Sequence, residues 1–343
     1  MLWLDSERAR LIYPDEIHLS SSKYMKIVLV TPAPPRSLNG NRVTASRWAR
    51  ILRNLGHNVR VQVEYGGGDC DLLIGLHGRR SNTSMELFKR IHPELPMVLV
   101  LTGTDLYEDT PSHPEVRRSL ELADAVVVLQ PRANDDLPEH IRPKVQVIIQ
   151  SARPTPGTPQ RSSKFFDIVV AGHLREVKDP FRAAIASRLL RADSRVRIVH
   201  AGEAMSMEME QMATEEMRSN FRYKWVGGVP RWRSRRLIRN SNALVVSSLL
   251  EGGANVISEA LSDHVPIIAS KMPGNIGLLG KDYPGYFQVG NSQSLANLIA
   301  EIEANSEFLR ELRQAVSSLE PGTRPEVEHA TWAKLLRKIS VPT

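Results

Sequence analysis

The sequence predicts an α/β protein made of two doubly wound, Rossmann-like domains that face a central cleft. Three observations carry this prediction. In both halves of the 343-residue chain, short apolar runs rich in Leu and Val alternate with helical patterns. Residues 151–163 hold three prolines and several hydroxyl side chains, as an interdomain linker does. The apolar run 243–250 then leads through a glycine pair into a helical segment, as a buried parallel strand does.

In the first half, strands are expected at six short runs in which apolar residues predominate or alternate with polar ones. The six runs span residues 26–30, 58–64, 72–76, 97–101, 125–129 and 145–149. Between the first two, Trp48, Leu52 and Leu55 recur at helical spacing, and Gly56 stands where a helix C-terminal cap belongs. Residues 1–24 carry charges throughout and lack a continuous apolar stretch, so we expect a flexible extension rather than a signal peptide.

The second half repeats the alternation. Its expected strands span residues 166–171, 196–200, 223–226, 243–250 and 266–270, and its expected closing helices span 294–318 and 328–339. We therefore expect one domain over residues 25–155 and a second over 156–324. The C-terminal helix, within residues 325–343, has Trp332, Leu335 and Leu336 on one side and could pack back on the first domain.

The composition excludes several classes of protein. No apolar run approaches the roughly 18–20 residues of a membrane span, so no stable membrane insertion is expected. The net charge of +7 permits anionic partners, but the densest basic cluster, residues 231–236 with Arg239, has no nucleic-acid-binding motif and is predicted to be the solvated face of a helix. The single cysteine, Cys70, rules out an internal disulfide, fits a cytoplasmic location and is expected to be a buried structural thiol.

Two glutamates separated by seven residues, Glu251 and Glu259, follow the strand–glycine–glycine turn. The open N-terminus of the following helix offers unpaired N–H groups and a positive dipole end, which suit a phosphate. Glu259, about two helical turns past Glu251, could accept hydrogen bonds from sugar hydroxyls. The pattern indicates a nucleotide-sugar site. The alternative, two solvated glutamates, is common at this spacing and stays open at this point.

The order of motifs after Met25 resembles that of glycosyltransferases with the GT-B architecture, specifically the family-four-like group. The motifs that carry the resemblance are residues 223–228, 242–248, 251–259, 264–270 and 285–290. The resemblance implies a UDP-sugar-dependent, metal-independent enzyme without a cofactor. It assigns Glu259 to the ribose of the donor. It assigns Glu251 and the backbone of Gly252, Gly253, Ala254 and Asn255 to the sugar and phosphates.

Residues 172–178 resemble the family's loop that carries a basic pair on the diphosphate. Gly172 begins this loop, and Lys178 fits the family lysine. His173 stands at the usual arginine position. Arg175, two residues on, either supplies the missing charge or lies on the surface.

In the first domain, candidate acceptor residues come from two loops. Gly40, Asn41 and Arg42 end a predicted loop after the first strand, where the family has a glycine-rich turn. Arg79 and Arg80 follow the third strand. An arginine fork matches phosphate oxygens, so these arginines predict an anionic acceptor site.

The candidate catalytic residues are His77, Thr102 and Asp105. His77 ends the third strand and is expected to point into the cleft, although a structural histidine is about as common there. Residues 102–105 resemble the family's HGxD-like loop, with Thr102 in place of the histidine that commonly contacts the donor sugar. This departure leaves both inversion and retention of the anomeric configuration open. Asp69 and Asp71 resemble an acidic metal motif but start a strand, so we expect them on the surface.

Segments 31–35, 40–45, 77–80, 101–107 and 129–131 resemble a narrower group, the selenosugar synthases of selenoneine biosynthesis. That resemblance implies UDP-N-acetylglucosamine as donor and selenophosphate as acceptor, with a selenosugar, UDP and phosphate as products. A selenium nucleophile is soft and already anionic, so it needs less general-base help than a hydroxyl. Two alternatives remain open: an ordinary GT-B glycosyltransferase acting on a glycan, lipid or small-molecule hydroxyl, and a non-catalytic nucleotide-sugar-binding protein.

Overall fold

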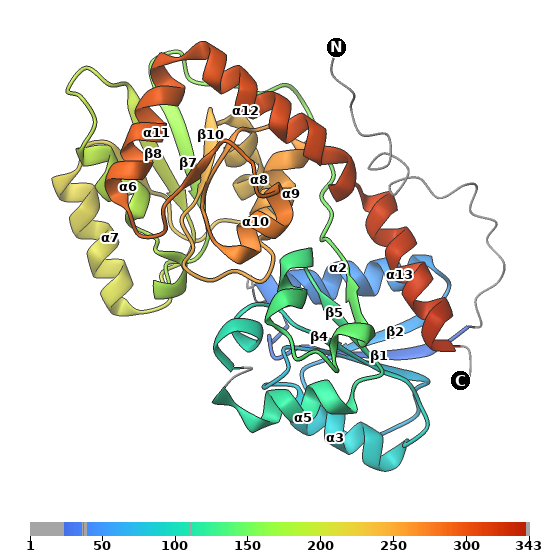
Figure 1. Ribbon diagram of the computed structural model, residues 1–343. Helices are drawn as coiled ribbons and strands as arrows, with labels where there is room; N and C mark the ends of the chain where they lie inside the picture. The colour runs from blue at the N-terminus through green and yellow to red at the C-terminus, as the bar shows by residue number, and fades with distance from the viewer. Residues whose placement is uncertain (1–23, 36, 38–39, 110–111, 341–343) are drawn as a thin grey trace, which may run out of the picture.

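The computed structural model describes residues 24–35, 37, 40–109 and 112–340. Two parallel α/β domains lie side by side, with the second domain above the first in the view of Figure 1. This arrangement confirms the predicted fold class. The expected N-terminal extension lies outside the described residues up to residue 23.

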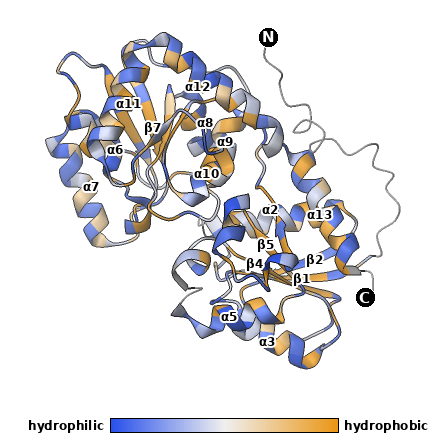
Figure 2. Cartoon of the chain, viewed as in Figure 1, coloured by the Kyte–Doolittle hydropathy of each residue, from blue (hydrophilic) through white to orange (hydrophobic). Residues whose placement is uncertain are grey.

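The first domain is built on a six-stranded sheet in which every pairing is parallel. Its strand order is β2 (Asn58–Gln62), β1 (Lys26–Val30), β3 (Leu72–Leu76), β4 (Met97–Val100), β5 (Ala125–Val128) and β6 (Val145–Val147). Helices α3 (Asn82–Ile91) and α5 (Pro114–Leu122) pack on one face of this sheet. Helix α2 (Gly40–Asn54) packs on the other face. The four inner strands, β1, β3, β4 and β5, are apolar after Lys26, as sheets covered on both faces require. The edge strand β2 instead alternates apolar residues with Asn58, Arg60 and Gln62 (Figure 2).

The second domain repeats this plan. Its strand order is β12 (Tyr286–Phe287), β11 (Ile267–Ser270), β10 (Ala243–Val246), β7 (Phe166–Ala171), β8 (Val196–Ala201) and β9 (Tyr223–Trp225). Its helices are α6 (Arg182–Arg188), α7 (Met207–Ser219), α8 (Arg231–Asn240), α9 (Asn255–Ser262), α10 (Pro273–Leu279), α11 (Ser292–Ala304) and α12 (Ser306–Leu319). In both sheets the strand order reverses beside the first strand of the domain, which is where open α/β sheets bind ligands.

Three of the differences from the sequence-based prediction have a local cause. The strand expected over 243–250 ends at Val246, because the Ser247 hydroxyl turns aside to donate to the carbonyls of Lys178 and Asp179. The helix expected over 294–318 is two helices, because the side chain of Asn305 caps the start of α12. The two-residue strand β12 was not predicted, since so short a run has no periodicity.

The C-terminal helix α13 (Pro325–Ser340) leaves the second domain and packs on α2 of the first (Figure 1). The rings of Trp48 and Trp332 are both fully buried and meet edge to face, 4.9 Å apart. The Glu328 carboxylate accepts from the Trp48 indole N–H at 2.6 Å and from the backbone N–H of Ser151 at 3.0 Å. Helix α13 is therefore part of the core of the first domain.

Trp332→Ala should destabilise the protein by about 3–5 kcal/mol, because it leaves a cavity against Trp48 and undocks α13. Urea denaturation followed by circular dichroism measures the change. The control is Lys334→Ala on an exposed position of the same helix, which should cost little. Equal stability of the two variants would show that α13 does not support the core.

Among the described residues, no helix combines the length and the apolar character that a bilayer crossing needs. Cys70 is buried, and that burial raises the pKa of its thiol. Asp69 forms an ion pair with Lys26, and Asp71 accepts a hydrogen bond from the backbone N–H of Lys26 at 2.6 Å. Both carboxylates thus bind Lys26, the first residue of β1.

Candidate functional site

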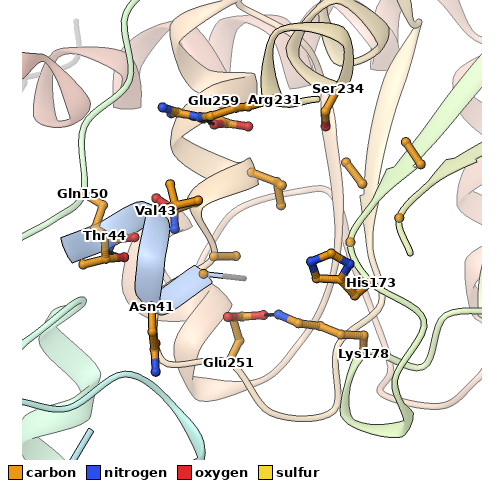
Figure 3. A pocket seen from close by; sticks show the side chains of 18 of the residues that line it. Asn41, Val43, Thr44, Gln150, His173, Lys178, Arg231, Ser234, Glu251 and Glu259 are labelled. Atoms are coloured by element: carbon orange, nitrogen blue, oxygen red, sulfur yellow. Dashed lines mark hydrogen bonds and ion pairs between the residues drawn. The ribbon is translucent and has the colours of Figure 1, made fainter. Parts of the chain in front are cut away.

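A cavity of about 240 Å³ lies between the two domains (Figure 3). We call it the interdomain cavity. Residues of α2 and of the loops after β4 and β5 line one side, and the loops after β7, β8 and β10 with the start of α9 line the other. Of the predicted site residues, it is lined by Gly40, Asn41, Thr102, Gly172, His173, Lys178, Glu251, Gly253, Ala254, Asn255 and Glu259.

The glycine pair after β10 allows the two domains to approach closely. A Cβ added to Gly252 would lie 2.6 Å from the backbone of Thr102 and Gly103, and one added to Gly253 would lie 2.4 Å from the Leu129 side chain. Only glycine fits such contacts. The pair therefore holds the start of α9 directly against the first domain.

The N-terminus of α9 opens into the interdomain cavity. Its cap residue is Ala254, whose side chain cannot accept a hydrogen bond from the first turn. The Asn255 side-chain oxygen accepts instead from Arg47 of α2, at 2.7 Å. The first-turn N–H groups and the positive end of the helix dipole are thus available to an anion in the cavity.

Lys178 and Glu251 form an ion pair at the edge of the cavity (Figure 3). Ser248 also donates to the Glu251 carboxylate, at 3.3 Å, and the hydroxyl of Ser247 holds the backbone that carries Lys178. The lysine side chain is 30% exposed, whereas that of Glu251 is 11% exposed. An anionic ligand could therefore reach the ammonium group and compete with Glu251 for it.

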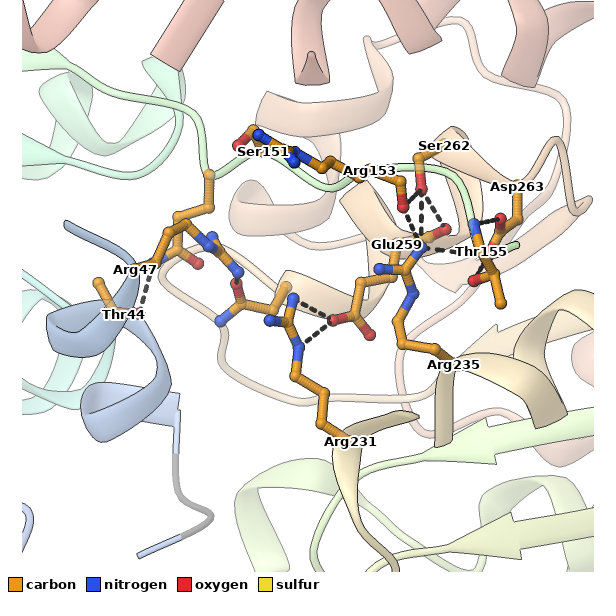
Figure 4. Close-up of polar contacts among 12 residues, drawn as sticks. Thr44, Arg47, Ser151, Arg153, Thr155, Arg231, Arg235, Glu259, Ser262 and Asp263 are labelled. Carbon is orange, nitrogen blue, oxygen red and sulfur yellow. Dashed lines mark hydrogen bonds and ion pairs between the residues drawn. The ribbon is translucent and has the colours of Figure 1, made fainter. Parts of the chain in front are cut away.

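Glu259 lies on α9 and is bound by Arg231 at the start of α8 (Figure 4). Nε and Nη2 of Arg231 donate to the same carboxylate oxygen at 3.0 and 2.9 Å. One turn later on α8, Arg235 pairs with Asp263 at 3.2 Å. The prediction that this basic cluster is a solvated face was wrong for Arg235, whose side chain is 12% exposed, whereas that of Arg231 is 46% exposed and also binds Glu259. Their spacing of four residues, which puts both on one side of a helix, was the signal that could have found them.

The glycine that begins the loop after β7 is fixed by a buried histidine. Nε2 of His200 lies 3.1 Å from the Gly172 carbonyl oxygen and Nδ1 lies 3.0 Å from the Tyr223 hydroxyl. Burial lowers the pKa of His200 to about 4, so the ring is neutral and Nε2–H donates to the carbonyl. Nδ1 of the neighbouring His173 accepts from the backbone N–H of Glu203 at 3.2 Å. His173 itself faces the cavity (Figure 3).

Because His200 stays neutral in the folded protein, stability should fall in acid. Below pH 6.5 the unfolded chain takes up a proton on His200 that the folded protein accepts only near pH 4. The loss should reach about 2 kcal/mol by pH 5. Urea denaturation at pH 7.5, 6 and 5 measures it, and His200→Gln should remove most of this slope. His140→Gln, at an exposed ring paired with Glu121, should keep it.

Arg175 does not line the interdomain cavity. Its side chain is exposed beside the short turn that carries Lys178. Of the two readings left open for this residue, the structure favours a surface position.

His77 and Asp105 lie behind the surface of the cavity and do not line it. The Asp105 carboxylate accepts from the backbone N–H groups of Gly78, Thr102 and Gly103 at 2.9, 2.8 and 2.8 Å. Nδ1 of His77 is 3.9 Å from that carboxylate, and the His77 backbone lies in the left-handed region, with φ 73°. The expectation that His77 points into the cleft was therefore wrong. Both side chains instead position the loop that presents Thr102.

The predicted acceptor arginines do not come together. Gly40, Asn41 and Arg42 form the first turn of α2 rather than a loop, so successive side chains point in different directions. Arg42 lines a second cavity instead, of about 410 Å³. Arg79 and Arg80 are exposed after β3 and line neither cavity. The prediction that these three arginines share one acceptor site was therefore wrong.

We call the second cavity the arginine cavity. It lies between α2, α8, the start of the linker and the start of α13, and Val43 and Arg231 line it together with the interdomain cavity. The arginine cavity could not be predicted from the sequence, because its residues come from four distant segments. Within the described residues, no group of three His, Cys, Asp or Glu side chains has the arrangement of a metal site.

Known proteins similar to this chain include glycosyltransferases. Residues 156–318 match the family described as glycosyl transferases group 1. Glycosyltransferase 1 domain-containing protein 1 of Xenopus tropicalis is 23% identical over 350 residues, covering 92% of this chain and 99% of that protein.

Two solved structures extend the likeness to the whole fold. HepE of Anabaena, in complex with UDP and glucose, has a TM-score of 0.72 at 16% identity, covering 92% of this chain and 100% of that one. Sucrose-phosphate synthase of Thermosynechococcus elongatus has a TM-score of 0.72 at 14% identity, covering 92% and 99%. The chain therefore has the GT-B fold.

Proposed function

We propose that this GT-B protein, whose residues 156–318 match the group 1 glycosyl transferases, transfers a sugar from a UDP-sugar to a small anionic acceptor. One observation carries the proposal: Lys178, Glu251, Glu259 and the open start of α9 surround a single cavity between the domains. HepE and the pneumococcal O-GlcNAc transferase GtfA, which share the fold, were both solved with UDP.

The donor binds with its ribose toward Glu259 and its diphosphate toward Lys178. A carboxylate accepts both ribose hydroxyls well, and the first turn of α9 between the two ends supplies N–H donors for phosphate. In this structure Arg231 pairs with Glu259, and Glu251 pairs with Lys178. The donor therefore replaces two ion pairs when it binds, and Glu251 then becomes available to the sugar.

Bond breaking at C1 of the sugar leaves negative charge on the diphosphate. Lys178 and the N–H groups around Gly253 and Ala254 would stabilise that charge, because they are fixed before the reaction begins. Thr102, held by Asp105 behind it, would face the opposite side of the sugar. A hydroxyl at this position binds a substrate but is a weak base.

The acceptor that we propose is selenophosphate, and the sugar is N-acetylglucosamine. The support comes from the first-domain motifs described above and from the chemistry of selenium, which attacks as an anion without a base. In the balanced reaction a C1–Se bond replaces the C1–O bond to UDP. Water then cleaves the P–Se bond, so that one selenosugar, one UDP and one phosphate are formed.

The first experiment incubates purified protein with UDP-N-acetylglucosamine, with and without fresh selenophosphate, and records mass spectra. We expect a selenium isotope pattern on an N-acetylhexosamine mass only when both substrates are present. UDP release without a selenium product would refute the acceptor and favour the ordinary glycosyltransferase. Donor binding without turnover would favour the binding protein.

A further inference from the structure

The arginine cavity is strongly cationic. Six guanidinium groups line it, those of Arg42, Arg47, Arg50, Arg153, Arg231 and Arg235, together with His329. Among the described residues that line it, none is a carboxylate. At about 410 Å³, it is large enough for a small organic anion.

Neighbouring carboxylates neutralise only part of this charge. Glu259 pairs with Arg231, and Asp263 pairs with Arg235 (Figure 4). Neither carboxylate lines the arginine cavity. The buried carboxylate of Glu328 acts on Arg47 through space. In the described part of the chain, these carboxylates act on Arg231, Arg235 and Arg47 from outside the lining, and the lining itself is cationic.

Two buried N–H groups of the cluster lack partners. Nη1 of Arg47 and Nε of Arg235 are buried, and neither has a hydrogen-bond acceptor in the described part of the chain. Burial lowers the pKa of the Arg47 guanidinium, as expected of a cation with too few partners. Leaving charged donors unpaired is costly, and an anion bound in the cavity would offset part of that cost through its charge.

We propose that the arginine cavity binds a small soluble anion that carries phosphate groups, and that this anion draws Arg231 away from Glu259. Arg231 is the one charged residue that lines both cavities. Once released, the Glu259 carboxylate can accept the hydroxyls of a donor ribose. The second half of the proposal rests on the proposed function, which assigns Glu259 to the donor. The anion would then act as an activator of donor binding.

The site is tested by calorimetric titration of inorganic pyrophosphate into protein saturated with UDP, at constant ionic strength. Saturation with UDP removes the interdomain cavity as a competing phosphate site. The double variant Arg50→Gln/Arg153→Gln changes two exposed side chains that line only the arginine cavity. It should weaken pyrophosphate binding by about tenfold or more.

The matched control is Arg90→Gln/Arg233→Gln, which removes the same charge from exposed positions outside both cavities. It should bind pyrophosphate as the wild type does. Equal weakening in both double variants would overturn the site, because the affinity would then follow net charge alone. Absence of pyrophosphate binding to the wild type would overturn it as well.

The coupling is tested by measuring UDP affinity with and without pyrophosphate. Pyrophosphate should raise the UDP affinity of the wild type by about fivefold. In the double variant Arg50→Gln/Arg153→Gln, pyrophosphate should only compete with UDP and therefore lower the UDP affinity. The same response in both proteins would refute the coupling. If UDP does not bind at all while pyrophosphate binds through Arg50 and Arg153, the proposed function fails and the anion site stands.

Discussion

Lys178→Ala should lower kcat for sugar transfer by about 10²–10³-fold. In the proposed function Lys178 binds the donor diphosphate, and charge on the leaving UDP develops only as the C1 bond breaks. Its loss should therefore act mainly on kcat, with a smaller rise in KM. Steady-state measurement of UDP release gives both constants.

The comparison variant is Arg175→Ala, on the same loop but outside the cavity. It should retain kcat within about twofold, since solvent screens an exposed charge. Lys178→Arg should recover part of the lost rate, because it restores the charge with a different geometry. If Lys178→Ala kept full activity, the diphosphate would have to bind elsewhere.

Gly252→Ala should lower kcat/KM by about 10²-fold while leaving the free energy of unfolding nearly unchanged. The added methyl group would lie 2.6 Å from the backbone of Thr102 and Gly103, and backbone atoms cannot move aside as a side chain can. The domains must then separate slightly, which moves Thr102 away from Lys178 and Glu251. Each domain core stays intact because the contact lies between them.

Kinetics and small-angle X-ray scattering should report this change together, with a larger radius of gyration for Gly252→Ala. Gly66→Ala is the control, because a Cβ there has open space. Wild-type activity of Gly252→Ala would mean that the close approach of the two loops is dispensable for transfer.

The fold could be predicted from the sequence because each buried strand is a separate apolar run. The runs at Lys26–Val30, Leu72–Leu76 and Phe166–Ala171 coincide with observed strands to the residue. The end of a strand was harder to predict where a polar contact with another segment ends the strand, as the contact of Ser247 with Lys178 does. Helix α2 was predicted, but its start at Gly40 was not, because no side chain of its first turn marks a helix start.

The candidate site was predictable in part for the same reason. Lys178, Glu251 and Glu259 belong to local motifs, and the structure brings them to one cavity. Arg231 and Arg47 act on the site through Glu259 and Asn255, which are distant in sequence. The Arg231–Glu259 contact depends on the packing of α8 against α9 within the second domain, and the Arg47–Asn255 contact depends on the docking of the two domains.

The return of α13 to the first domain has a consequence for how the chain can be divided. The polypeptide passes between the domains twice, and the two passages lie together, since the N–H of Ala152 donates to the carbonyl of Thr323 at 3.0 Å. Two adjacent connections favour rotation of one domain against the other about an axis through the connections, and they oppose rotation about other axes. The first domain is also discontinuous in sequence, so a single cut after the linker would separate Trp48 from Trp332 and leave the first fragment without the α13 residues of its core.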